Sequence, residues 1–217
     1  MKKQKSQRST SMKYKNAADF LAFIGMSAIV LSVVYITTPK TADPLTIVLF
    51  ILLIIPTIIA LVSGAPFVPT PMHIGKKMLE LGKIKHGEKV VDIGCGDGRL
   101  VYMAANEFGA KAIGYELSPV VYAIAKIRQL LWRSKAKIKF GDFRMHNLSD
   151  VDCIVTYMLP DTLKKFIPKF ERELKSGSRI ISYAFNIGDW KPIHIEPSSA
   201  EENRSKIFVY EIGKHAN

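Results

Sequence analysis

The 217-residue chain has 31 lysines and arginines against 19 acids, which gives it a net charge of +12. Its length allows one ordinary domain with an appendage. Its two cysteines, Cys95 and Cys153, form no CxxC pair and no cluster with histidine, so a disulfide framework and a structural metal site are both disfavoured.

The positive charge is concentrated at the start of the chain. Residues 1–16 contain six bases and no acid. A tail of this composition binds either nucleic acid or an anionic membrane surface. Because uncharged segments follow it, we expect membrane lipid to be its partner and nucleic acid to be disfavoured.

Two uncharged segments, residues 20–38 and 45–64, are each long enough to cross a hydrocarbon core of about 30 Å. Neither has the polar face of a helix that packs on a soluble core. We therefore predict a two-helix transmembrane hairpin within residues 17–64. Bases flank it on both sides, which places the N-terminus and the domain that follows the hairpin in the cytoplasm.

This topology predicts a multi-pass protein of the cell membrane. The mitochondrial inner membrane is the alternative, because a basic tail also resembles a transit signal. Lysine outnumbers arginine five to one in the tail, which disfavours that alternative.

Residues 65–88 are expected to form a proline-rich linker and a short helix over residues 72–84. From residue 89 to 217 strands alternate with helices, which predicts an α/β fold with a parallel sheet and helices on both faces. Two short terminal strands near residues 193–196 and 206–212 extend the sheet as a hairpin and bring it to seven strands. The expected strands are 89–93, 111–116, 137–141, 153–157 and 179–185, and the helices are 99–108, 119–134 and 161–174.

The first strand runs into a glycine-rich turn, residues 94–98, and then into a helix. Glycines permit positive φ and let a ligand approach bare backbone, and the helix start offers unpaired amides. This pattern indicates a nucleotide-like cofactor. Asp97 disfavours a dinucleotide, because it would lie beside the pyrophosphate. S-adenosylmethionine fits better, since its sulfonium and ammonium groups are cations.

Acidic residues follow several of the predicted strands. At the edge where open α/β sheets bind ligands, Asp92 and Asp97 can hold the cationic methionine end. Glu116 can accept both ribose hydroxyls. Asp142 can accept the adenine amino proton, with Phe143 against the ring face.

The segments VVDIGCGDGR, GYELSP and GDF resemble motifs of class I S-adenosylmethionine-dependent methyltransferases. They are most similar to the membrane-anchored protein-lysine methyltransferases that modify the ATP-synthase c-subunit and the adenine nucleotide translocase, and to their prokaryotic relatives. The resemblance runs from Pro66 to about Pro192 and implies a Rossmann-like, seven-stranded class I methyltransferase sheet, with S-adenosylmethionine as cofactor and no metal. The expected cofactor-binding residues are Asp92, Gly94, Cys95, Gly96, Asp97, Gly98, Glu116, Leu117, Asp142 and Phe143, and the expected acceptor channel is Val68, Pro69 and Thr70.

The acceptor side is less specified. Many amine methyltransferases have an Asn/Asp-Pro-Pro-aromatic motif after the fourth strand, where this chain has Thr156-Tyr-Met-Leu-Pro160. That difference excludes the DNA-adenine and glutamine class. A lysine acceptor has an ordinary pKa of about 10.4, and an apolar channel lowers it. Tyr157 is the candidate catalytic residue beside the acceptor nitrogen.

These observations predict a membrane-anchored protein-lysine N-methyltransferase that acts on a membrane-associated protein. A small-molecule, lipid or quinone methyltransferase is the first alternative. A non-catalytic membrane protein that retains the cofactor-binding fold is the second. A nucleic-acid substrate is disfavoured, because about half of the net charge lies in the tail.

Overall fold

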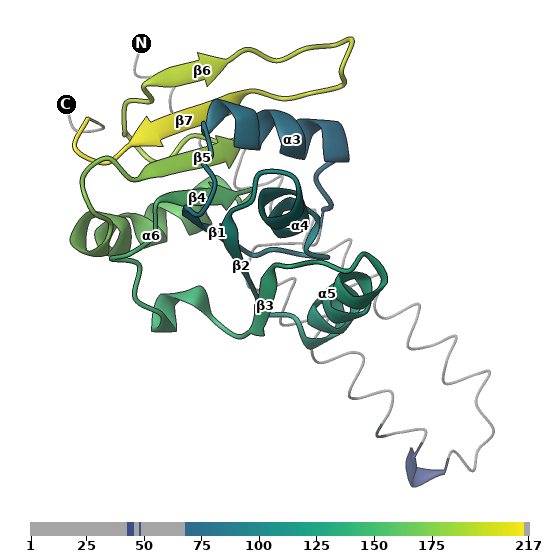
Figure 1. Cartoon of the computed structure of the whole chain (residues 1–217). Helices are drawn as coiled ribbons and strands as arrows, with labels where there is room; N and C mark the ends of the chain where they lie inside the picture. Colours follow the sequence, from purple (N-terminus) through teal and green to yellow (C-terminus); the bar gives the residue numbers. More distant parts are fainter. Residues whose placement is uncertain (1–42, 46–47, 49–67, 215–217) are drawn as a thin grey trace, which may run out of the picture. The chain divides into compact units, whose positions relative to one another are not determined.

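The computed structural model describes residues 43–45, 48 and 68–214 of the chain (Figure 1). The predicted tail, residues 1–16, lies outside these residues, and so do the predicted spans at 20–38 and 45–64, apart from residues 45 and 48. Residues 43–45 and 48 belong to a different unit from residues 68–214, and residues 44, 45 and 48 are helical.

The predicted membrane location requires a correction. Across residues 43–45, 48 and 68–214, every helix is too short or too polar to cross a bilayer. This finding contradicts the prediction of a multi-pass protein in the cell membrane. The predicted cytoplasmic placement of the N-terminus and the catalytic domain is withdrawn with it, because it depended on the two spans.

A seven-stranded sheet is the centre of residues 68–214, and its strand order is β3-β2-β1-β4-β5-β7-β6 (Figure 1). The first five strands in this order are parallel, and β7 is antiparallel to both of its neighbours. The chain leaves β1 on one side and returns to its other side at β4, so the ends of these two strands form the switch point where such sheets bind ligands. The strands are β1 (Lys89–Ile93), β2 (Lys111–Glu116), β3 (Lys137–Phe140), β4 (Cys153–Thr156), β5 (Arg179–Tyr183), β6 (His194–Glu196) and β7 (Ile207–Glu211).

Helices cover both faces of the sheet, as predicted. Buried side chains of α3, α4 and α5 form one hydrophobic core with one face, and Leu163, Phe166 and Phe170 of α6 form a second core with the other. Each core is continuous with the alternating side chains of the central strands, for example Val90 on one face and Val91 on the other. The helices are α3 (Met72–Leu81), α4 (Arg99–Asn106), α5 (Pro119–Leu131) and α6 (Pro160–Glu173), and η1 (Phe143–Met145) is a short 3-10 helix.

Several elements end earlier than the sequence predicts, and for β5 and α5 a residue with left-handed backbone gives the reason. β5 stops at Tyr183 because Ala184 has φ +65, so the strand does not reach residue 185. α5 stops at Leu131, shortly before Arg133 with φ +49. A left-handed non-glycine residue continues neither a strand nor a right-handed helix.

The helix α5 exposes much of its apolar surface. Ala125 is its only buried residue, whereas Leu130 is 78% and Leu131 is 74% exposed. Val120, Ile124 and Ile127 on the same helix are also exposed. The expected helix is therefore present, but most of its apolar residues do not pack on the sheet.

Candidate active site

A cavity of about 340 Å³ opens at the carboxyl ends of β1, β2 and β4. Of the 14 predicted site residues, 13 line this cavity, and Gly98 is the exception. The 13 come from separate segments: the turn after β1, the ends of β2, β3 and β4, and residues 68–70 before α3. The structure thus brings together residues that are up to 89 positions apart (Val68 and Tyr157). Their roles in binding remain predictions.

Glu116 ends β2 and joins it to the turn after β1. Its Oε2 accepts a hydrogen bond of 2.9 Å from the Gly96 amide, and its Oε1 accepts one of 2.8 Å from the Ser118 amide. Burial raises the pKa of the Glu116 carboxyl, and these amides offset part of that effect. Each oxygen keeps a further lone pair, so the carboxylate can still accept hydrogen bonds from the two hydroxyls of a ribose.

Asp92 lies at the end of β1 with 2% of its surface exposed, and it lines the cavity. Within residues 68–214 its side chain has no hydrogen bond or ion pair. Burial, and then the charges of Glu116 and Asp97, raise the pKa of its carboxyl well above the ordinary value. A cationic ligand group in the cavity would relieve this unfavourable electrostatic environment.

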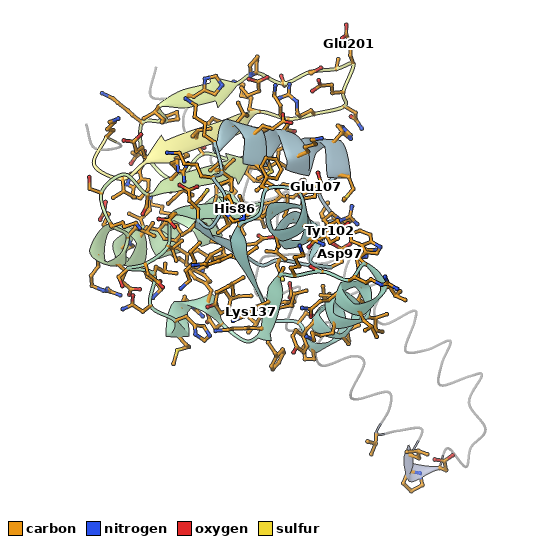
Figure 2. The ribbon with its side chains drawn as sticks, in the orientation of Figure 1. His86, Asp97, Tyr102, Glu107, Lys137 and Glu201 are labelled. Atoms are coloured by element: carbon orange, nitrogen blue, oxygen red, sulfur yellow. The ribbon has the colours of Figure 1, made fainter. Side chains whose placement is uncertain are left out.

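Asp97 is electrostatically different from Asp92, although both line the cavity. Its carboxylate accepts hydrogen bonds from Arg99, Nε at 3.0 Å and Nη2 at 2.6 Å, and forms a second ion pair with Arg128. It thereby lies between the start of α4 and α5 (Figure 2). Burial raises the pKa of Asp97, but the two arginines outweigh it and the pKa is lowered. The charge that we expected to face a cationic ligand already has two protein cations beside it.

Gly98 has a structural reason for being glycine. It precedes α4 with φ +82, and a Cβ at this position would lie 2.7 Å from Ile138 Cδ1 of β3. The residue is buried and does not line the cavity. The third glycine of the turn therefore permits close packing of α4 and β3.

Asp142 and Phe143 follow β3 and begin η1. Asp142 accepts hydrogen bonds from the backbone amide of Arg144 at 2.9 Å and from its Nε at 2.7 Å. Partial burial alone would raise the pKa of the Asp142 carboxyl. The contacts with Arg144 outweigh burial, so the pKa is lowered. The Phe143 ring is 5% exposed and lies edge-on to Phe166 with centroids 4.6 Å apart, so most of its surface packs in the core.

Tyr157 follows β4 and lines the cavity. Its ring lies edge-on to Tyr183 with centroids 4.8 Å apart and stacks near Phe185. Burial and the neighbouring Tyr183 raise the pKa of the Tyr157 hydroxyl, so it is protonated at neutral pH. In the described part of the chain this hydroxyl has no hydrogen-bond partner, which leaves it available to a ligand.

Several cavity residues were not predicted. Arg99 directly follows the glycine turn and Ser118 caps α5, so their positions in the motifs carried a signal. Thr162 and Lys165 line the cavity from α6. The sequence offered no sign that this part of α6 faces the cavity.

The described residues show no metal-binding group. Among residues 43–45, 48 and 68–214, no three histidine, cysteine or acidic side chains cluster in a way that suits a metal ion. The acids around the cavity are instead separated along three strand ends. Such an arrangement suits an elongated ligand with hydroxyl and cationic groups.

Comparison with known proteins identifies the fold and family. Residues 92–194 match the family described as the ANTKMT methyltransferase domain. The chain is 32% identical over 157 residues to a protein-lysine N-methyltransferase of Saccharolobus islandicus, which covers 71% of this chain and 98% of that protein. The chain belongs to this methyltransferase family. The recognition of the family from the three sequence motifs is therefore confirmed.

Two further matches agree with this assignment. A human lysine N-methyltransferase named for the ATP synthase c-subunit is 32% identical over 134 residues, which are 60% of this chain and 56% of that protein. An RNA methyltransferase structure from Salinibacter ruber, in complex with S-adenosylhomocysteine, aligns with a TM-score of 0.63 and 26% identity, over 69% of this chain and 97% of that one. The chain is an S-adenosylmethionine-dependent methyltransferase.

Proposed function

We propose that this methyltransferase acts on the ε-amino group of a lysine in another protein. The similarity to the S. islandicus protein-lysine N-methyltransferase carries the proposal, because it extends over nearly the whole of that relative. The human relative named for the ATP synthase c-subunit supports a protein acceptor as well.

At the cofactor end of the cavity we assign a role to each strand end. S-adenosylmethionine supplies an activated methyl group on a sulfonium. Asp92 faces the cationic methionine end, because it is buried beside the cavity without a protein cation. Glu116 accepts the ribose hydroxyls with its free lone pairs. Asp142 accepts from the adenine amino group, and Gly94 and Gly96 let the backbone approach the ligand.

At the acceptor end the cavity is bounded by residues 68–70, Tyr157 and Met158. The acceptor ammonium must lose a proton to solvent before its nitrogen attacks the methyl carbon, and the C–S bond of the sulfonium then breaks to leave a neutral thioether. Apolar surroundings and the positive charge of Lys165 in the cavity wall both lower the pKa of that ammonium. In this proposal the Tyr157 hydroxyl hydrogen-bonds the neutral amine, and positioning of the reacting groups supplies much of the catalysis.

The proposal is tested by incubating the full chain with labelled S-adenosylmethionine and a cell extract, then separating protein, RNA and lipid. We expect label in the protein fraction that is recovered as ε-methyl-lysine after acid hydrolysis, and none with the Glu116→Ala variant. Label confined to RNA or to lipid extracts would contradict the proposal. Dividing the protein fraction into soluble and membrane proteins tests the narrower prediction of a membrane-associated acceptor.

A further inference from the structure

Arg99 connects two segments that both line the cavity. It is the first residue of α4 and lines the cavity. Its Nε and Nη2 donate to Asp97, and its Nη1 donates to the carbonyl oxygen of Thr70 at 3.0 Å. One guanidinium therefore joins the glycine turn to a residue 29 positions earlier in the chain.

We call residues 68–70 the strap. All three line the cavity, and Thr70 is 5% exposed whereas Val68 is 53% exposed. On its C-terminal side the strap leads into α3, which packs closely on α4 because residue 75 is glycine. A Cβ on Gly75 would lie 2.5 Å from Met103 Cε. Within residues 68–214, Arg99 is the only side chain that hydrogen-bonds to the strap.

The chain contains a natural control for this contact. Arg128 of α5 also forms an ion pair with Asp97, and its guanidinium lies 4.7 Å from the centre of the Trp132 ring. Among the described residues it forms no hydrogen bond or ion pair with the strap. Both arginines thus neutralise Asp97, but within the described residues only Arg99 also hydrogen-bonds to Thr70.

We propose that Arg99 is a positioning residue that holds the strap in place over the methyltransferase cavity, with Asp97 as its anchor. The strap forms part of the cavity wall, so its position affects how the reacting groups are aligned. A planar guanidinium can bind a carboxylate with two donors and a carbonyl with a third, which a lysine ammonium cannot reproduce. Loss of the contact should affect alignment more than cofactor affinity.

The test compares Arg99→Gln with Arg128→Gln in the full chain. Hydrogen exchange is measured on peptides that contain the Val68 and Thr70 amides. The initial rate of labelled methyl incorporation into extract protein is measured across S-adenosylmethionine concentrations. For Arg99→Gln we expect exchange at least about 10-fold faster and a maximal rate about 10- to 100-fold lower, with the KM for S-adenosylmethionine changed by less than about 3-fold.

For Arg128→Gln we expect the strap exchange rate and the maximal rate of methyl incorporation to stay within about 3-fold of those of the unmodified protein. Equal effects of the two substitutions, or unchanged strap exchange in Arg99→Gln, would overturn the proposal. If Arg99→Gln does not fold, Arg99→Lys and Arg128→Lys give the same comparison with the charges retained. The exchange measurement does not depend on the acceptor, so its failure is distinguishable from a failure of the lysine assignment.

Discussion

The carboxylate of Glu116 accepts a 2.9 Å hydrogen bond from the amide of Gly96, and this bond fixes the end of β2 against the turn after β1. The two residues are 20 positions apart, and both line the cavity. The bond orients Glu116 before any ligand binds. A preoriented carboxylate needs little rearrangement when it accepts the hydroxyls of a ribose.

Glu116→Gln is expected to weaken S-adenosylmethionine binding by about 10- to 100-fold, the range for hydrogen bonds to a charged group. The glutamine side chain has an NH2 group in place of one acceptor oxygen. That group cannot accept a hydrogen bond, so either a backbone N–H or a ligand hydroxyl loses its acceptor. Calorimetric titration of the full chain measures the effect. An unchanged dissociation constant would show that the ribose does not contact Glu116.

Asp92→Asn is expected to stabilise the ligand-free protein at neutral pH while weakening S-adenosylmethionine binding. The buried carboxylate has no partner within residues 68–214, and such a group destabilises the fold by about 1–3 kcal/mol. The asparagine side chain removes the buried charge. It also removes the counter-charge for the cationic methionine end, so affinity falls in the same variant.

The pH dependence of this stabilisation has a definite sign. The folded pKa of Asp92 lies above its ordinary value of 3.8, so the protonated form favours folding. That stability is fully present below pH 3.8 and is lost as the pH rises through the folded pKa. The advantage of Asp92→Asn should therefore be absent in acid and grow towards neutral pH. Urea unfolding at several pH values measures it, and a variant less stable at pH 7 would contradict the assignment.

Asp150→Asn is the matched control. Asp150 is exposed and pairs with Lys89 at 2.7 Å, and that contact lowers the pKa of Asp150. Removing its charge should change the free energy of unfolding by less than about 0.5 kcal/mol and should give no gain at neutral pH.

Gly98→Ala is expected to destabilise the fold more than Gly87→Ala. Both glycines have φ +82, so both substitutions introduce the same backbone strain of about 1–2 kcal/mol. A Cβ on Gly98 would also lie 2.7 Å from Ile138 Cδ1, whereas nothing lies within 4 Å of one on Gly87. Overpacking adds about 1–3 kcal/mol to the first variant only. Thermal unfolding of both proteins gives the difference, and equal losses would show that the contact with Ile138 relaxes freely.

The double substitution Leu130→Gln and Leu131→Gln is expected to change the free energy of unfolding by less than about 1 kcal/mol, because both side chains are more than 70% exposed. Phe170→Ala, at a fully buried position of α6, should lose about 3–5 kcal/mol. Urea unfolding compares the two proteins. A loss above about 2 kcal/mol in the double variant would mean that the exposed face of α5 is covered in the full chain.

The sequence was informative where local pattern determines structure. The strand ends at Asp92, Glu116 and Asp142 could be located because apolar strands, glycine turns and helices alternate. Parallel strands bring their carboxyl ends to one edge. In the structure these three acids line one cavity.

Other features depended on contacts between distant residues. Nothing near Arg128 indicated that it pairs with Asp97, 31 positions earlier, because a base on a helix usually faces solvent. The same is true of Lys165, which lines the cavity from α6. The contact of Arg99 with Thr70 required the three-dimensional placement of α3 on α4, which periodicity does not give.

The most direct measurement of the central claim is quantitative mass spectrometry of proteins from cells with and without the gene. The account predicts that at least one lysine is methylated in the presence of the gene and unmethylated in its absence. Methylation should return with the natural protein and not with Glu116→Ala. An unchanged set of methyl-lysines, with methylated RNA or lipid lost instead, would contradict the lysine assignment.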